Sequence, residues 1–175
     1  MSDSSTGARV ALASEGTANV TTGLPVLDHL VTELARSGRF RLTLEVAPGG
    51  PDQAVGEAGR AFGAAIAERL AAAGAAGRGW AIVAADEALA LAAIERADES
   101  RFVTNVDFSD QRVGGLGTDV PSRFLQELSE AAELNLHVRL VEGTDPQHVL
   151  AAIFKAVGAA LGQACRPIPD AKEPS

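Results

Sequence analysis

The side chains of this chain that could do chemistry are three histidines, which stand far apart in the sequence. His29 lies in LDHL, His137 in NLHVRL and His148 in TDPQHVLAAIFKA. An imidazole can bind a metal ion or move a proton in acid–base catalysis. A lone histidine is more often a surface or core residue, so both interpretations stay open for each of the three.

Several carboxylates could act with these histidines, but they have an equally good structural explanation. Negative charge in the first turn of a helix is favoured because it complements the helix dipole. The carboxylates concerned are Asp28, Asp52, Glu57 and Asp145. The single cysteine, Cys165, excludes an internal disulfide and a cysteine-based zinc site, and a buried structural thiol is the favoured interpretation.

The composition is that of an acidic chain that can bury a sizeable core. Of 175 residues, 46% are hydrophobic and 22% charged, and 15 Lys and Arg against 23 Asp and Glu give a net charge of −8. This charge argues against nucleic acid or an anionic membrane as the main partner, whereas a small anionic ligand needs only a few local cations. No apolar run reaches the roughly 20 residues that cross a bilayer, and residues 1–7 lack the pattern of a signal peptide. We therefore expect a cytoplasmic protein.

Periodicity predicts the elements that must position these residues. Alternating or short apolar runs predict strands over residues 9–14, 18–22, 40–46, 80–85, 102–108 and 134–141. Helical spacing predicts helices from Pro25 to the Ser37-Gly38 pair and over residues 53–73, 120–132 and 146–163. Residues 89–97 have helical propensity, and taken alone they predict a further helix.

An internal repeat relates two of these helices. The segment from Asp52, DQAVGEAGRAFGAAI, aligns with the segment from Gln147, QHVLAAIFKAVGAAL, at a constant offset. The order strand, strand, helix, strand, helix therefore occurs twice, in halves spanning residues 8–78 and 79–166 of one compact domain. Residues 1–7 are predicted to be a disordered tail and 167–175 a polar tail. Two small sheets, each backed by two helices, could bury a shared layer of four helices.

Three segments carry a resemblance to a known family. TGLPVLDHLVTELARSGRF is similar to the TGIxFLDHMLxQxARHGxF segment of imidazoleglycerol-phosphate dehydratases, and DEALA at 86–90 matches their MDEALA. The region from RVGGLGTDVPSRF to NLHVRLVEGTDPQHVLAAIFKAVGAAL is similar to the second half of that family. The resemblance runs from about Val20 to Arg166.

The resemblance implies a fold, an activity and an assembly. It implies a duplicated α+β fold of the ribosomal protein S5 domain 2-like type, in which a helical layer lies between two four-stranded sheets and residues 89–95 form a strand. It implies the dehydration of a small phosphorylated imidazole in histidine biosynthesis, with two Mn²⁺ ions per active site. It also implies homo-oligomeric shells of 24 subunits, built from trimers and held partly by shared metal sites.

The metal ligands that the resemblance implies are mostly replaced in this chain. The family takes six ligands from an HHxxE motif at the start of each long helix and two from the histidines of LDHM and LHxR. Here the two motif positions hold Asp52-Gln53-Ala54-Val55-Gly56 and Gln147-His148-Val149-Leu150-Ala151. His29, His137 and His148 remain, Asp52 replaces one histidine, and five of the eight positions are altered.

Other family positions are partly kept. Arg112 and Lys155 fall on positions implied to contact the substrate phosphate, although solvated basic residues are an equally good interpretation. The family's N-terminal RxTKET-like segment has no clear counterpart, and its C-terminal PSTKG loop is reduced to Pro174-Ser175.

Two hypotheses of different classes follow. The first is a non-catalytic family member with a structural, regulatory or binding role, which assembles as a trimer or smaller oligomer because metal-bridged contacts are lost. The second is an enzyme: a weak dehydratase with one metal held by His148, Asp52, Glu57 and His29 or His137, or a different lyase that uses Asp and His as acid and base.

Overall fold

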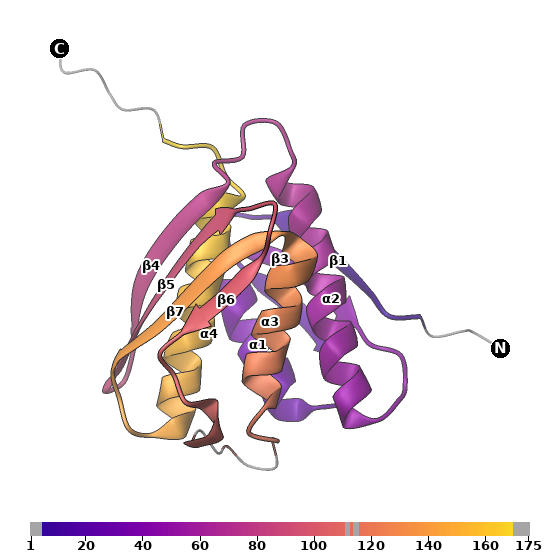
Figure 1. The fold of residues 1–175 in the computed structure, drawn as a ribbon. Coiled ribbons are helices and arrows are strands. Elements are labelled where there is room, and N and C mark those ends of the chain that lie inside the picture. The colour runs from indigo at the N-terminus through magenta and orange to yellow at the C-terminus, as the bar shows by residue number, and fades with distance from the viewer. Residues whose placement is uncertain (1–4, 111–112, 114–115, 170–175) are drawn as a thin grey trace.

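The computed structural model describes residues 5–110, 113 and 116–169, and it contains two sheets with four long helices between them (Figure 1). The first sheet has the strand order β1-β3-β2, in which β3 pairs antiparallel with β1 and parallel with β2. Its strands are β1 (Gly7–Leu12), β2 (Thr17–Thr21) and β3 (Phe40–Glu45). The alternation in β3 puts Phe40, Leu42 and Leu44 in the core.

The second sheet has the order β4-β5-β7-β6, with β6 and β7 parallel and the other neighbours antiparallel. Its strands are β4 (Arg78–Ala85), β5 (Ala88–Arg96), β6 (Arg101–Thr104) and β7 (Leu134–Glu142). The resemblance predicted a strand over residues 89–95, and β5 confirms it. The helix predicted there from propensity alone is wrong, because β5 pairs on both sides and buries every second side chain from Ala88 to Ile94.

The helices form one layer between the two sheets. They are α1 (Pro25–Ser37), α2 (Pro51–Leu70), α3 (Val120–Ala132) and α4 (Pro146–Ala164). Helices α1 and α2 pack on the first sheet, and α3 and α4 pack on the second. Across the layer, α1 packs against α4 and α2 against α3. Phe124 stacks between Phe62 and Phe154, with ring centroids 6.4 and 5.9 Å apart, so the layer shares one core.

The duplicated α+β fold is confirmed, but the two sheets are unequal in size. The unit β1-β2-α1-β3-α2 corresponds to β5-β6-α3-β7-α4, and β4 is additional. Strand β1, the counterpart of β5, has no preceding hairpin partner among the described residues. In the described residues the first sheet therefore has three strands, and not the four that the family resemblance implied.

The aligned glycines of the repeat lie where helices approach closely. A Cβ on Gly63 of α2 would lie 2.6 Å from the carbonyl oxygen of Leu128 in α3. Its counterpart Gly158 in α4 meets the carbonyl oxygen of Leu34 in α1 in the same way. The repeat therefore preserves two equivalent helix contacts that admit no side chain.

Several element boundaries differ from the sequence-based expectation. Strand β6 ends at Thr104 instead of 108. The Asn105 side chain donates from Nδ2 to the Leu140 carbonyl (3.1 Å) and accepts at Oδ1 from the Leu140 amide (2.8 Å). These bonds replace the backbone pairing with β7 at that point. Helix α2 ends at Leu70 and not at 73. Strand β1 begins at Gly7, the last residue of the predicted tail, and Thr6 bonds to Glu57 and to the amide of Ala47.

Two further observations concern the chain as a whole. Within the described ranges, no helix combines the length and the apolar character needed to cross a membrane. Cys165 is buried, as predicted, and burial raises the pKa of its thiol to about 11. At that pKa the thiol is protonated near neutral pH and is a poor nucleophile.

Candidate functional site

Two of the predicted site residues meet in a pocket of about 420 Å³ where the first turns of α1 and α4 approach the β4–β5 turn. We call it the α1–α4 pocket. Its polar side chains are His29, Asp86, Gln147 and His148. Its apolar lining comes from Pro25, Val26, Leu30, Val113, Leu150 and Ala151. A volume of this size suits a small ligand.

Two carboxylates of the β4–β5 turn hold His148 on both sides of its ring. Glu87 Oε2 lies 2.6 Å from Nδ1, and Asp86 Oδ2 lies 3.3 Å from Nε2. The hydrogen bond to Glu87 raises the pKa of His148 above its ordinary value, and the charges of Glu87, Asp145 and Asp86 act in the same direction. Desolvation opposes this shift without reversing it. The arrangement favours the imidazolium, whose two N–H groups can donate to the two carboxylates.

The local sequence explains why the turn meets the helix. Asp86 adopts a left-handed conformation (φ 51°), which aspartate tolerates in a tight hairpin turn. Asp145 caps α4 by accepting from the amides of Gln147 (2.9 Å) and His148 (3.4 Å). The Asp145 amide in turn donates to Glu87 Oε1 at 3.2 Å. One carboxylate, Glu87, therefore ties both the cap and the histidine of α4 to the second sheet. The pKa of Glu87 is lowered first by a hydrogen bond from its own backbone amide and then by the hydrogen bonds to His148 and the Asp145 amide.

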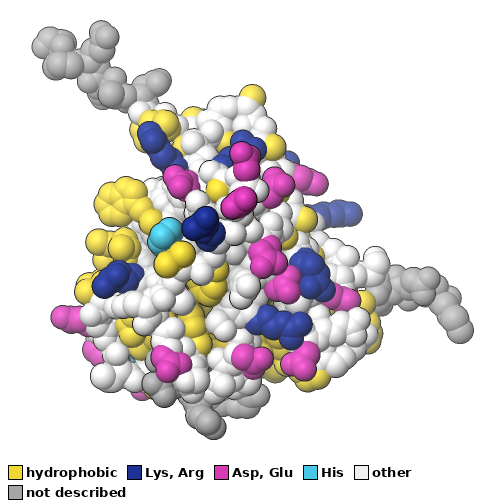
Figure 2. Space-filling view, in the orientation of Figure 1, with side chains coloured by type: hydrophobic (Ala, Val, Ile, Leu, Met, Phe, Trp, Pro, Cys, Tyr) yellow, Lys and Arg dark blue, Asp and Glu magenta, His cyan; other side chains and the backbone are white. Residues whose placement is uncertain are grey.

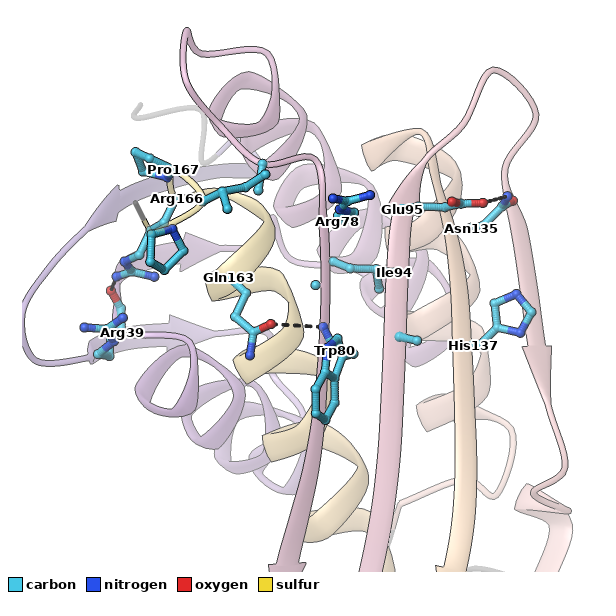
Figure 3. Close-up of a pocket in the computed structure, with 15 residues that line it drawn as sticks. Arg39, Arg78, Trp80, Ile94, Glu95, Asn135, His137, Gln163, Arg166 and Pro167 are labelled. Atoms are coloured by element: carbon cyan, nitrogen blue, oxygen red, sulfur yellow. Dashed lines mark hydrogen bonds between the residues drawn. The ribbon is translucent and has the colours of Figure 1, made fainter. Parts of the chain in front are cut away.

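The other predicted ligands lie elsewhere in the chain. His137 is on the exposed outer face of β7, opposite Ala93 of β5 and Val103 of β6 (Figure 3). Asp52 is in the first turn of α2, where its side chain is 90% exposed and lies 3.9 Å from Arg123. Glu57, named for the rebuilt site, bonds to Thr6 and Gln53, and these bonds lower its pKa. Within one subunit, then, the α1–α4 pocket brings together only His29 and His148 of the proposed ligands.

Of the two predicted phosphate contacts, Lys155 does not line this pocket. The Lys155 ammonium lies 3.7 Å from Glu33 Oε2, between α4 and α1, and the Lys155 carbonyl accepts from Ser37 at 2.6 Å. These contacts give Lys155 a structural role in joining two helices. Arg112 lies outside the described residues.

Asp86 and Glu87 were not among the predicted site residues. A signal for them was present, because they open the DEALA segment that contributed to the family resemblance. The sequence gives no sign that this turn approaches α4, because Glu87 and His148 are 61 positions apart in the chain.

Within one subunit, the described residues do not assemble the ligands for the two Mn²⁺ ions that the resemblance implied. Across the described residues, no group of three or more His, Cys, Asp or Glu side chains is placed to hold a metal ion. Both ring nitrogens of His148 face carboxylates, and the motif positions beside it are Gln147 and Ala151. A structural or catalytic metal needs several deprotonated ligands that converge on one point, and this pocket does not supply them.

Comparisons with known proteins agree with the fold and the motifs. A sequence model of the family described as imidazoleglycerol-phosphate dehydratase matches residues 22–161. The imidazoleglycerol-phosphate dehydratase of Desulfitobacterium hafniense is 37% identical over 164 residues, which cover 90% of this chain and 83% of that protein. The protein of the same name from Desulforudis audaxviator is 34% identical, over 90% of this chain and 84% of that protein.

Solved structures show the same fold. The crystal structure of imidazoleglycerol-phosphate dehydratase from Staphylococcus aureus superposes with a TM-score of 0.83 at 23% identity, and covers 94% of this chain and 99% of that chain. The structure of IGPD from Pyrococcus furiosus in complex with (S)-C348 gives a TM-score of 0.77 at 19% identity, over 99% of this chain and 96% of that chain.

Proposed function

The chain belongs to the imidazoleglycerol-phosphate dehydratase family, and from that premise we propose that it is a catalytically degenerate member which keeps the fold without the two-manganese chemistry. Its remaining role is then structural, regulatory or ligand-binding. The proposal rests on the chemistry of the donor set, and not on the absence of an ion.

The observation that carries the proposal is the way His148 is engaged. Where the family motif implies a second histidine and a glutamate beside it, this chain has Gln147 and Ala151. Glu87 and Asp86 instead contact both ring nitrogens and favour the protonated ring. A protonated imidazole has no lone pair for a metal, so binding an ion there requires the loss of that proton and of both contacts.

Titration of the purified chain with Mn²⁺ by calorimetry tests this proposal. We expect no pair of tight sites per chain at neutral pH. The double substitution Gln147→His with Ala151→Glu restores two motif ligands in the first turns of α4, and we expect it to raise the Mn²⁺ affinity by about tenfold or more. Two tight sites in the unaltered chain would contradict the proposal.

A second candidate function is that of an ordinary dehydratase, and the sequence identity to proteins of that name favours it. In that case substitute ligands rebuild a site, with contributions from other subunits. The deciding assay incubates the purified chain with Mn²⁺ and imidazoleglycerol phosphate and measures imidazoleacetol phosphate. Product formed at a rate that Mn²⁺ stimulates supports the second candidate, and no product supports the first.

We also propose that the chain forms a homo-oligomer smaller than the shell implied by the resemblance. Shared metal sites can hold subunits together only where ligands are available to share, and most of those positions are replaced. The mass in solution, measured by light scattering with and without Mn²⁺, tests this: a trimer or smaller species that does not respond to Mn²⁺ is expected, and assembly into a 24-subunit particle would contradict it.

A further inference from the structure

The first sheet has an open strand edge at the place where the second sheet continues. Strand β1 pairs with β3 alone, whereas its counterpart β5 pairs with β7 on one side and with β4 on the other. The two halves correspond closely here, because the amide of Ala13 donates to the Arg39 carbonyl and that of Ala97 to the Glu133 carbonyl, both at 3.0 Å. Arg39 and Glu133 also share a left-handed backbone, with φ of 55° and 56°. The occupied edge of β5 is therefore a direct guide to the open edge of β1.

The backbone groups of three β1 residues point out of this open edge. In an antiparallel pair, alternate residues direct both the amide and the carbonyl to the neighbouring strand. The Ala13 amide donates across to Arg39, so residues 9 and 11 also face β3 and the even-numbered residues face away from it. In the second half, the equivalent of Leu12 is Arg96, whose amide donates to the Gly77 carbonyl beside β4 at 2.8 Å. The outward-facing residues of β1 are Ala8, Val10 and Leu12.

The side chains that β1 turns toward the core are only partly covered. Val10 lies opposite Leu42 and is partly exposed, and Leu12 is 40% exposed. In the second half, Ile94 lies opposite Leu136 and is only 5% exposed. Strand β4 flanks β5 and accounts for this difference. A further strand beside β1 would cover apolar surface as well as backbone groups.

Helix α2 lies over the open edge as its repeat counterpart α4 lies over β4. Helix α4 packs on both β4 and β5, and α2 packs on β1 (Figure 1). A Cβ on Gly79 of β4 would overlap the carbonyl oxygen of Ala160 in α4. The counterpart of Ala160 in α2 is Ala65, and Ala61, the counterpart of the buried Ala156, is partly exposed. Figure 2 shows charged side chains of both signs on the surface over α2 and α3, so these alanines are an apolar strip on the sheet side of a charged helix.

Strand β1 has none of the features that commonly block a free strand edge. Its residues, GARVAL, include no proline, and its pairing with β3 runs without a bulge. The one charged residue, Arg9, lies on the outer face of the sheet, because it alternates with the core-facing Ala8 and Val10. An edge without proline, bulge or inward-pointing charge accepts a further strand.

The position of α2 favours a lone extended segment over a second copy of β1. Packed helices are about 8–10 Å apart and adjacent strands about 4.8 Å, so one helix covers about two strands. Helix α4 covers β4 and β5 in this way. An antiparallel β1–β1 pair between two copies would place two α2 helices over two strands, and there is room for only one.

We propose that the β1 edge binds an extended peptide segment, which adds a fourth, antiparallel strand to the first sheet and has small side chains where it passes under α2. In this mode of recognition, main-chain hydrogen bonds give affinity and alternate side chains give selectivity. Strand β4 shows the pattern that fits, because the small residues Gly79, Ala81 and Ala85 are its buried positions. The proposal is independent of the proposed function, because the β1 edge contributes no residue to the α1–α4 pocket.

The chain itself supplies the probe, a dye-labelled peptide of residues 76–84 with the sequence AGRGWAIVA. Ala81 lies opposite Ala92 in the β4–β5 register, so in the same register on β1 it lies opposite Ala8. We expect the fluorescence anisotropy of the peptide to rise to saturation as the purified chain is added.

Two singly N-methylated peptides are the matched controls. In β4, the Trp80 amide donates to Gln163 Oε1 at 3.1 Å, away from β5, so the Ala81 amide faces the neighbouring strand and the Ile82 amide faces away (Figure 3). Methylation of the Ala81 nitrogen removes a donor and should weaken binding about tenfold or more. Methylation of the Ile82 nitrogen should weaken it by less than about threefold.

Amide hydrogen exchange, measured by NMR, locates the bound peptide. The outward amides of Ala8, Val10 and Leu12 should exchange about tenfold more slowly or less when the peptide is bound. The amides of Arg9 and Ala11, which face β3, should change little and serve as the internal control.

A variant of the edge blocks the site without removing a bond to β3. Val10→Pro replaces an amide that points outward, a place where an edge strand tolerates proline, and its ring fills the position of the added strand. Peptide binding should be lost in Val10→Pro and retained in Val10→Ala. Circular dichroism and urea unfolding check that both variants fold, and the methylated peptides test the proposal without any variant.

Four results would overturn the proposal. The first is no saturable binding of the peptide, and the second is equal weakening by the two methylations, since binding would then not use the backbone of one peptide edge. The third is slowed exchange at another strand edge in place of β1. The fourth is slow exchange at Ala8, Val10 and Leu12 in the free chain that increases with protein concentration, which would show that a second copy occupies the edge.

Discussion

The three histidines show how strongly the surroundings of a residue decide its chemistry. His148 lies between two carboxylates at a helix start, His29 faces the same pocket from α1, and His137 stands on an exposed sheet face. An isolated imidazole has the same capacities in all three places. For His148 the structure provides two carboxylate partners that favour the protonated ring, so the residue-scale prediction concerns that side chain.

Replacement of Glu87 by glutamine should lower the pKa of His148. The hydrogen bond to Glu87 is the largest cause of the raised pKa, so its loss removes most of the shift. NMR titration of the His148 ring protons measures this directly. Asp86→Asn is the matched control, because the charge of Asp86 is the smallest of the contributions and its contact is longer, at 3.3 Å. An equal effect of the two variants would contradict the assignment.

The same pair makes the stability of the chain depend on pH in a defined direction. The His148 pKa is raised above 6.5, so its contribution is fully present below 6.5 and is lost as pH rises through the folded-state pKa. The Glu87 pKa is lowered below 4.5, so its contribution is present above 4.5 and is lost as pH falls through the folded-state value. The difference in unfolding free energy between the unaltered chain and Glu87→Gln, measured by urea denaturation, should therefore be largest between about pH 4.5 and 6.5.

At the scale of elements, side chains decide where strands stop. The pattern of residues 102–108 predicts a strand to its end, yet β6 stops at Thr104 because Asn105 takes over the bonds to Leu140. Thr104 then accepts from the Val106 amide, and Asp107 accepts from the Ser109 amide and hydroxyl, which turns the chain away from the sheet. The polar residues, and not a change in apolar periodicity, end this strand.

Asn105→Ala should therefore destabilise the chain through β6. Both hydrogen bonds of the amide to the Leu140 backbone are lost, and at this exposed position we expect a decrease of about 1 kcal/mol in the free energy of unfolding. Urea denaturation monitored by circular dichroism measures it. Asn19→Ala, an exposed strand residue of the first sheet, is the control and should change stability by less than about 0.5 kcal/mol. No difference between the variants would show that Asn105 does not anchor β6.

At the scale of the whole molecule, the two halves are held together by backbone contacts between helices. Glycines on α4 meet the carbonyl oxygens of α1 and of the turn after it: Gly158 meets Leu34, and a Cβ on Gly162 would lie 2.5 Å from the oxygen of Gly38. Because the partners are backbone atoms, they cannot rotate away as a side chain could. The helical layer depends on this close approach.

Gly158→Ala should separate α4 from α1 and destabilise the fold. Alanine is the better helix former, but overpacking against fixed backbone outweighs that gain, and we expect a loss of about 1–3 kcal/mol. Thermal and urea unfolding measure the change. Gly7→Ala is the matched control, since a Cβ at Gly7 meets nothing within 4 Å. Similar stabilities for the two variants would show that α4 can shift without loss.

Much of the fold could be predicted from local patterns. Helix α1 and strand β3 were predicted correctly, from the helical spacing of Leu27, Leu30 and Leu34 and from the alternation in β3. Burial of one face of an element requires apolar residues at a fixed spacing, so the sequence shows it directly. The repeat and the LDHL and DEALA segments predicted the duplicated fold and the family. Two of the four polar side chains of the candidate pocket, His29 and His148, were also named from sequence.

What only the tertiary structure decided depends on segments that are distant in the chain. Residues 88–96 form a strand because two neighbouring strands pair with them, although their composition favours a helix. Asp86 and Glu87 become partners of His148 because the β4–β5 turn meets α4, and His137 faces outward because of the register of β7. Sheet pairing and helix packing set these relations through contacts between distant residues, and local periodicity carries no information about them.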